Sequence, residues 1–275
     1  MIVVTGATGN VGRPLVEALV KAGKEVTAVS RGDGPQGVRH ARADLAEPAS
    51  LRPVLAGAEA LFLLVSGAGA HLDPRAIVEA ARAGGVRRIV LLSSQAAMTR
   101  PGSVSHAPLR AIEEVVEQSG LDWTLLRPSG FASNAFAWVP SVRAERTVAA
   151  PFGSVRLPIV DPLDIAEVAA AVLTGDGHAG RAYEITGPEA TTPRQRAQAI
   201  GDALGEPVRF VEQTPAEARA QMLQFMPEPV VDGTLAIIGE PTEAEQRVSP
   251  DVERLLGRKA YTFAEWVQRN VTAFR

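Results

Sequence analysis

The sequence predicts an α/β fold: a doubly wound parallel sheet with helices on both faces, followed by a small C-terminal α/β lobe. Short apolar runs alternate with amphipathic helical patterns up to about residue 187. The apolar runs are nearly continuous in Val, Ile and Leu, which is typical of parallel strands buried on both faces. A glycine-rich turn joins the first strand to the first helix. These three observations predict the sheet.

The predicted elements follow in order along the chain. The first strand is Ile2–Thr5, and the helix after it repeats apolar residues about every fourth position until Gly23 ends it. Beyond Gly187 the chain becomes helical and polar, with one short strand near 208–211. The other strands are predicted at 25–30, 39–43, 60–65, 88–92, 123–126 and 182–185, and the helices at 50–55, 74–83, 109–119, 166–173, 193–204, 215–224, 251–256 and 263–272.

The composition excludes several classes of protein. The chain has 275 residues, of which 46% are hydrophobic and 21% charged, as in ordinary globular proteins. The net charge of -3 gives no basic excess, so we expect no nucleic-acid partner. Cysteine is absent, which excludes disulfides, a cysteine nucleophile and a cysteine zinc site, and no His, Asp and Glu cluster has metal-ligand spacing. With no membrane-spanning apolar run and no signal peptide, we expect a cytoplasmic protein without a membrane partner or a metal.

The strongest local motif is the loop between the first strand and the first helix. Glycines stand at Gly6, Gly9 and Gly12, and this strand, loop and helix order is what a dinucleotide-binding loop requires. Gly6 allows the tight turn, Gly9 lets the backbone approach a pyrophosphate, and Gly12 lets the helix pack close to the sheet. The free N–H groups of the helix N-terminus would then face the phosphates. The predicted cofactor-binding residues of this loop are Gly6, Thr8, Gly9, Asn10, Val11 and Gly12.

The end of the second strand indicates which nucleotide binds. Arg31 stands nineteen residues after Gly12, where an NAD enzyme usually has an acidic residue for the ribose hydroxyls. An arginine there suits a 2′-phosphate, so NADP(H) is favoured over NAD(H). Asp33 is near and could serve a 2′-hydroxyl instead. After the third strand, Asp44 and Leu45 are predicted at the edge of the adenine, although Asp44 could equally cap the following turn.

We expect one compact body with two parts. Residues 1–187 form the predicted NAD(P)-binding domain of Rossmann type, and residues 188–275 form a smaller substrate lobe. Residues 130–156 interrupt the alternation of strands and helices and are expected to contribute to the substrate pocket. The predicted pocket residues are His71, Phe131, Asn134, Phe136 and Trp138, with ordinary core packing as the alternative for the aromatic ones.

An ordered set of motifs carries a family resemblance. The set comprises Gly6–Gly12, Arg31, Asp44-Leu45, Ser93-Ser94, residues 119–121 and 124–128, Phe131 with Asn134, and residues 161–165. Together they resemble the atypical short-chain dehydrogenase/reductases of the NmrA-like group. That resemblance implies an NADPH-dependent reductase similar to quinone reductases and triphenylmethane reductase, or a cofactor-sensing regulator.

The sequence departs from the family's usual catalytic motif. Typical short-chain dehydrogenases carry Tyr-x-x-x-Lys on the helix after the fifth strand, but the two tyrosines here, Tyr183 and Tyr261, lie elsewhere. By order along the chain, His106 takes the place of the tyrosine and Arg110 that of the lysine. His106 is the predicted proton donor, and Arg110 is predicted to hold the nicotinamide ribose. The alternatives are a loop histidine and a solvated helix arginine.

Other residues at strand ends complete the predicted cofactor site. Ligands of doubly wound sheets bind at the carboxyl ends of the strands. We therefore expect contacts from Val65 and Ser66 after the fourth strand, Ser93 after the fifth and Arg127 after the sixth. Met222, Phe225 and Met226 form an apolar cluster that could be a lid, a dimer contact or simple packing.

The predicted function is NADPH-dependent hydride transfer to an apolar, quinone-like or other conjugated small molecule. Reduced quinone oxygens can take protons from water, so a missing tyrosine is compatible with this chemistry. The alternatives are a non-catalytic NADP-sensing regulator and a biosynthetic reductase or isomerase that uses His106 as an acid. The chain is expected to act as a monomer or a homodimer.

Overall fold

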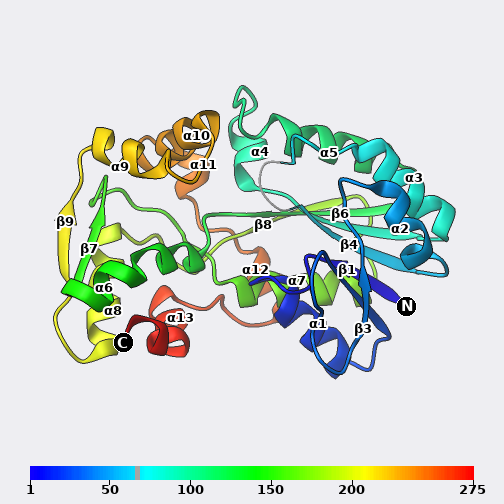
Figure 1. Ribbon diagram of the computed structural model, residues 1–275, viewed down its shortest axis with the longest axis horizontal. Helices are drawn as coiled ribbons and strands as arrows, with labels where there is room; N and C mark the ends of the chain where they lie inside the picture. The colour runs from blue at the N-terminus through cyan, green and yellow to red at the C-terminus, as the bar shows by residue number, and fades with distance from the viewer. Residues whose placement is uncertain (66–68) are drawn as a thin grey trace.

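The computed structural model describes residues 1–65 and 69–275 and contains a seven-stranded sheet (Figure 1). The strand order is β3-β2-β1-β4-β5-β6-β8, and every neighbouring pair is parallel. The predicted fold class is therefore confirmed. The strands are β1 (Ile2–Thr5), β2 (Val26–Ser30), β3 (Arg39–Arg42), β4 (Ala60–Leu64), β5 (Arg88–Leu92), β6 (Asp122–Pro128) and β8 (Arg181–Ile185).

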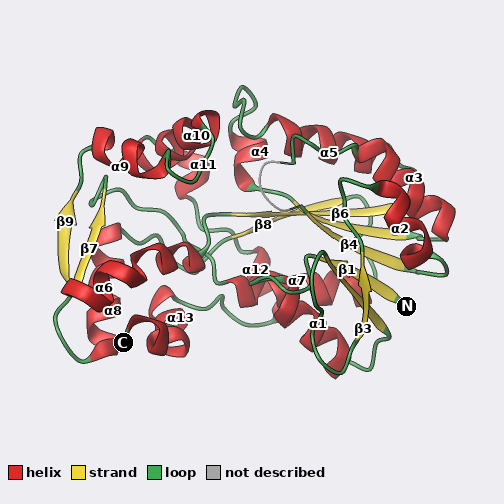
Figure 2. Ribbon diagram, viewed as in Figure 1, coloured by secondary structure: helices red, strands yellow, loops and turns green. Residues whose placement is uncertain are grey.

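Helices cover both faces of this sheet, as Figure 2 shows. In β1, Ile2 and Val4 point to one face and Val3 to the other, because side chains alternate along a strand. One face is covered by α1 (Gly12–Lys21), α7 (Pro162–Thr174) and α12 (Asp251–Leu256). The other is covered by α2 (Pro48–Leu55), α3 (Pro74–Gly84) and α5 (Ala107–Glu117).

The strand order places a crevice at the centre of the sheet. The chain runs outward from β1 to β2 and β3, then returns to the other side of β1 as β4. Helices that follow β1 and β4 therefore lie on opposite faces, and a crevice opens between them at the carboxyl ends of the strands. The glycine loop after β1 stands at this edge, so the fold positions it for a ligand.

A second lobe packs beside the sheet edge and combines two segments of the chain. Strand β7 (Thr147–Ala150) pairs in parallel with β9 (Arg209–Glu212). The segment 130–156 and the residues after 187 share one apolar core, which includes Val142, Ile200 and Trp266. This lobe contains η1 (Ala132–Trp138), α6 (Val139–Glu145), α8 (Pro193–Leu204), α9 (Pro215–Met222), α10 (Glu228–Gly239), α11 (Glu243–Gln246), α13 (Phe263–Asn270) and η2 (Val271–Phe274).

Four α-helices in the described part of the chain have no counterpart in the sequence prediction. They are α4 (Gln95–Thr99), α6, α10 and α11. Helix α4 is short and begins at Ser94, whose hydroxyl accepts from the backbone amide of Ala96 at 3.2 Å. Helix α10 contains Gly233 and several β-branched residues, so its intrinsic helix propensity is low and tertiary packing decides its structure. No helix in the described part of the chain is both long and apolar enough to cross a bilayer.

Candidate cofactor and substrate site

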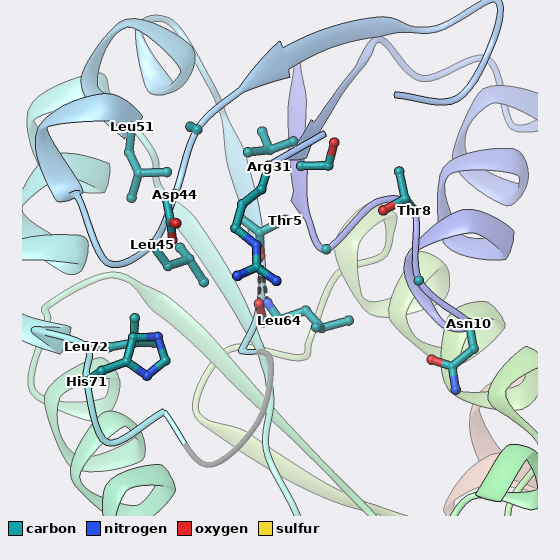
Figure 3. Close-up of a pocket in the computed structure, with 15 residues that line it drawn as sticks. Thr5, Thr8, Asn10, Arg31, Asp44, Leu45, Leu51, Leu64, His71 and Leu72 are labelled. Atoms are coloured by element: carbon teal, nitrogen blue, oxygen red, sulfur yellow. Dashed lines mark hydrogen bonds between the residues drawn. The ribbon is translucent and has the colours of Figure 1, made fainter. Parts of the chain in front are cut away.

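A cavity of about 350 Å³ lies at the carboxyl ends of β1, β2 and β4. Figure 3 shows side chains from the glycine loop on one side of it and from the segments after β2, β3 and β4 on the other. The hydroxyl of Thr5 joins the ends of β1 and β4, because it accepts a hydrogen bond from the backbone amide of Leu64 at 2.8 Å. The predicted cofactor residues found on the cavity wall are Gly6, Thr8, Gly9, Asn10, Arg31, Asp44 and Leu45.

The glycine loop leaves no room for a side chain at Gly6 or Gly12. Gly6 has a φ of +63°, and a Cβ there would lie 2.8 Å from Leu64 Cδ2. A Cβ on Gly12 would lie 2.1 Å from the carbonyl oxygen of Gly6, which is backbone and cannot rotate away. Close packing of α1 against the loop therefore requires glycine at position 12, as the motif predicts.

The N-terminus of α1 keeps backbone donors available. Val11 is the N-cap residue and gives no side-chain cap, and the first turn has no acidic residue. The amides of Asn10 and Val11 donate to no other group in the described part of the chain. The positive end of the helix dipole adds to these donors, so the arrangement suits an anion. The side chain of Asn10 donates to Ser133 Oγ at 2.7 Å and joins the loop to η1.

Arg31 reaches from the end of β2 into the cavity (Figure 3). Among the described residues, no carboxylate lies within ion-pair distance of its guanidinium. Asp33, the alternative ribose partner, lines a neighbouring hollow instead. The cavity therefore offers a cation at this position and no carboxylate from Asp33.

Asp44 caps a turn and also lies on the cavity wall. Its Oδ1 accepts from the amide of Ala46 at 3.0 Å, which caps the turn before α2. The same residue also lines the cavity, together with Leu45. His71 lies on this wall as well, beside Leu72 (Figure 3). The structure therefore places His71 with the predicted adenine edge, apart from the predicted substrate residues of segment 130–156.

The carboxyl end of β5 carries an unpartnered hydroxyl. Ser93 is buried, and its Oγ has no hydrogen-bond partner among the described residues. A buried polar atom without a partner is costly, so this position favours a ligand group. Val65, at the end of β4, is half-buried and packs on the apolar core of its face. Ser66 lies outside the described residues.

His106 is the N-cap residue of α5 and is half-buried. Its Nδ1 lies 3.0 Å from Ser105 Oγ and 3.3 Å from Ser103 Oγ. Burial, and then the charge of the nearby Arg110, lower the pKa of His106 below its ordinary value. The imidazole is therefore neutral at pH 7, with Nδ1 facing two hydroxyls and Nε2 without a hydrogen-bond partner in the described part of the chain.

Arg110 holds the loop before α5. Its guanidinium donates to the carbonyl oxygens of Arg100 at 3.3 Å and Ser103 at 3.2 Å. These contacts fix the segment that carries Ser103, Ser105 and His106. Arg110 therefore holds the backbone of the loop that carries His106, and the predicted ribose contact would have to use its remaining N–H groups.

Arg127 is held by a carboxylate at the end of β6. Its Nε and Nη2 donate to the two oxygens of Glu113 at 2.9 and 2.7 Å. Glu113 is buried, with 5% of its surface exposed, and this hydrogen-bonded pair raises the pKa of Arg127. The predicted cofactor contact of Arg127 therefore competes with a bidentate ion pair that fixes α5 to β6.

Replacing Glu113 with glutamine is expected to lower the free energy of unfolding by about 3 kcal/mol, because it leaves a half-buried arginine without a countercharge. Urea denaturation measures this. The matched control is Glu114→Gln, since Glu114 is the exposed neighbour on the same helix. Equal midpoints for the two variants would show that the pair contributes nothing to stability.

The predicted substrate residues of segment 130–156 do not share one wall. Phe136 packs on Trp266, with ring centroids 5.0 Å apart, but its side chain is exposed at the surface of the second lobe. The guanidinium of Arg196 lies 5.6 Å above the ring of Trp138. Phe131 packs against the core of the sheet, and Asn134 is exposed. The segment joins the two lobes, and two of its aromatic residues, Phe131 and Trp138, pack against the cores of these lobes.

Neither tyrosine is available for the usual acid role. Tyr183 OH lies 2.9 Å from Nδ1 of His178. Tyr261 stacks beneath the guanidinium groups of Arg258 and Arg269, at 4.0 and 4.5 Å. The described residues also contain no group of three or more His, Asp or Glu side chains that could hold a metal ion.

Comparison with known proteins identifies the family. A family model described as NAD(P)H-binding matches residues 6–176. The chain belongs to this NAD(P)H-binding family. The match begins at Gly6 and therefore includes the glycine loop described above.

Three relatives show how far the similarity extends. A (4-alkanoyl-5-oxo-2,5-dihydrofuran-3-yl)methyl phosphate reductase of Streptomyces griseus is 37% identical over 100% of this chain and 99% of its own. An NAD(P)H azoreductase of Xenophilus azovorans is 31% identical, with the same coverage. The structure of an NADPH-dependent quinone oxidoreductase of Escherichia coli has a TM-score of 0.83 at 27% identity, over 98% of this chain and 99% of that one.

These similarities confirm the resemblance that the motifs indicated. The chain is an NAD(P)H-dependent oxidoreductase of the atypical short-chain type. Its similarity to the relatives covers the C-terminal lobe as well as the nucleotide-binding part.

The sequence analysis missed residues that hold the site together through hydrogen bonds. It named His106 but gave no role to Ser103 and Ser105, although the run from Ser103 to His106 holds two hydroxyls beside an imidazole. It also gave no role to Arg100, which reaches across to the second lobe. The contacts of Arg100 join segments that are far apart in the chain, so no local pattern indicates them. The contacts of Ser103 and Ser105 with His106 are local, and the Ser-x-Ser-His sequence was the signal that could have indicated them.

Proposed function

We propose that this oxidoreductase uses NADPH to reduce a conjugated, electron-poor and largely apolar small molecule. Three features at the cavity support this cofactor: glycines whose positions leave no space for a Cβ, free amides at the N-terminus of α1, and Arg31 at the end of β2. The unpartnered hydroxyl of Ser93, at the carboxyl end of β5, adds to them. The glycine loop would hold the pyrophosphate, Arg31 the 2′-phosphate, and Ser93 the nicotinamide end. NADPH supplies a hydride when it is bound.

The names of the relatives support the substrate class. One reduces a compound whose 5-oxo-2,5-dihydrofuran ring has a carbon–carbon double bond conjugated to carbonyl groups. The second is named for azo compounds and the third for quinones. All three acceptors have a double bond that is polarised by conjugation. Such acceptors need a hydride in the right position and little acid catalysis.

The single observation that carries the proposal is the placement of His106. It stands where the family's tyrosine is expected, and its imidazole is half-buried, neutral and held at Nδ1. In the tautomer in which Nδ1 accepts a hydrogen bond from Ser103 or Ser105, the proton lies on Nε2. His106 can then donate from Nε2 and stabilise the negative oxygen or nitrogen that develops on the acceptor. Water can then deliver the final proton. This role replaces the usual tyrosine without requiring a strong acid.

Replacing His106 with alanine is expected to lower kcat about 10- to 100-fold, because one hydrogen bond to the developing charge is lost. The KM for NADPH should stay unchanged. Because the pKa of His106 lies below 6.5, the neutral form predominates above that pH. The wild-type contribution of His106 should therefore be constant from about pH 7 to 8. Steady-state NADPH oxidation with a quinone acceptor measures both effects.

His178→Gln is the matched control, since His178 contacts Tyr183 away from the cavity. If His106→Ala turns over as fast as this control, His106 takes no part in the reaction. NADPH binding in the complete absence of turnover with quinones, azo compounds and unsaturated lactones would instead favour the sensing-regulator alternative.

A further inference from the structure

The hydroxyl pair beside His106 forms a small polar cluster in the loop between α4 and α5. Ser103 Oγ and Ser105 Oγ lie 3.0 Å apart, and both face Nδ1 of His106. Arg110 fixes the backbone of this loop through the carbonyl oxygens of Arg100 and Ser103. The orientation of the imidazole therefore depends on where the loop places Ser105.

Arg100, which follows α4, binds the same loop to the second lobe. Its Nε and Nη2 each donate to the carboxylate of Glu245 at 2.8 Å, and Glu245 is 2% exposed. Nη2 also lies 2.7 Å from the carbonyl oxygen of Glu240, at the end of α10. One arginine thus ties the loop beside His106 to both α10 and α11. Figure 1 shows α10 and α11 beside this loop, across from α4.

A close backbone approach adds a second contact between α10 and the loop. A Cβ on Gly233 would lie 2.3 Å from Ser105 Oγ and 3.2 Å from Ser105 Cβ. Glycine inside a helix costs about 1 kcal/mol relative to alanine, so its presence here is explained by the space that Ser105 needs. Around this contact, a hollow of about 680 Å³ separates the loop from α10. The close contact between α10 and the loop at Gly233 and Ser105 is therefore confined to a small area.

We infer that Gly233 is a positioning residue for His106 and acts through Ser105. The inference rests on the proposed function, in which His106 donates a hydrogen bond to the acceptor. Helix α10 belongs to the second lobe, which the sequence predicts to be the substrate lobe, so this lobe would also position the imidazole of His106. The charged groups around His106 are Arg110 on α5, Arg100 after α4 and Glu245 on α11, and Asp232 of α10 lines the adjoining hollow.

Gly233→Ala tests the inference. The added methyl group must displace Ser105 or push α10 away, which lets water reach the imidazole. Because burial is the main cause of the lowered pKa of His106, the pKa should rise toward its ordinary value. Histidine NMR titration of the free protein measures this without any substrate. Turnover should fall about 10-fold while the KM for NADPH stays the same.

Two further variants make the test specific. Gly102→Ala is the matched control, because a Cβ at Gly102 meets nothing within 4 Å in the same loop. Ser105→Ala should cause a similar rise in the pKa, and the double variant Ser105→Ala/Gly233→Ala should add little, because both changes act through one hydroxyl.

The outcomes separate this inference from the proposed function. An unchanged His106 pKa in Gly233→Ala, or additive effects in the double variant, would overturn the positioning role. A shifted pKa with unchanged turnover would leave the positioning role intact and contradict the catalytic role of His106. Loss of the folded state would be visible in the NMR spectrum, and Ser105→Ala alone would then decide whether the hydroxyl sets the pKa.

Discussion

Replacing Arg31 with alanine is expected to weaken NADPH binding about 10- to 100-fold and to leave NADH binding nearly unchanged. A charge-assisted hydrogen bond contributes about 1.5–3 kcal/mol, and a 1.4 kcal/mol change is tenfold in affinity. Arg31 points into the cavity and has no carboxylate partner among the described residues, so its charge is available to a 2′-phosphate. Fluorescence or calorimetric titration with both nucleotides measures the ratio of affinities.

The control for this variant is Gly32→Ala, since a Cβ at Gly32 meets nothing within 4 Å. Raising the salt concentration should weaken wild-type NADPH binding more than Arg31→Ala binding, because an exposed charge pair is screened. Equal affinity of the wild type for NADPH and NADH would contradict the assignment of Arg31 to a 2′-phosphate. Asp33, whose side chain belongs to the adjoining hollow, would then be the first residue to test for a ribose contact.

Replacing Gly12 with alanine is expected to weaken binding of either nucleotide at least about 100-fold. The added Cβ would lie 2.1 Å from the carbonyl oxygen of Gly6 and 2.8 Å from Cα of Ala7. These are backbone atoms, so α1 must move away from the loop, at a cost of about 1–3 kcal/mol in stability. The amides of Asn10 and Val11 would move with it and lose their common direction. Titration with NADPH and thermal unfolding measure the two effects.

Glu17→Ala is the matched control for Gly12→Ala, because Glu17 lies on the exposed face of the same helix. It should bind NADPH as the wild type does. If Gly12→Ala also kept its affinity, the glycine loop would not be the pyrophosphate site.

The parts of the structure that could be predicted from the sequence depend on local patterns. Buried parallel strands are continuous apolar runs, and the turn after β1 needs glycine at Gly6 and Gly12 for steric reasons that hold in any such loop. The strand order then brings Arg31, Asp44 and the glycine loop to one cavity. These residues are predictable because each directly follows a strand at the same sheet edge.

The remaining parts of the site depend on contacts between distant segments. Arg100 was given no role, yet its guanidinium contacts Glu245 and the carbonyl oxygen of Glu240, which only the folded chain brings near. Phe136 belongs to an aromatic cluster with Trp266, 130 residues further along the chain. Gly233 has a role only because α10 returns to the loop beside His106. Periodicity and motif spacing cannot indicate such pairings.

The most direct test of the proposed function is hydride transfer followed with NADPH that carries deuterium at C4. The purified protein is incubated with this cofactor and, in separate reactions, a quinone, an azo compound and an acyl-substituted unsaturated lactone. We expect NADPH oxidation with at least one acceptor, and deuterium in the reduced lactone on the carbon β to its carbonyl group if the lactone is the substrate. NADPH that binds tightly but is oxidised by none of the three would contradict the proposed reductase function.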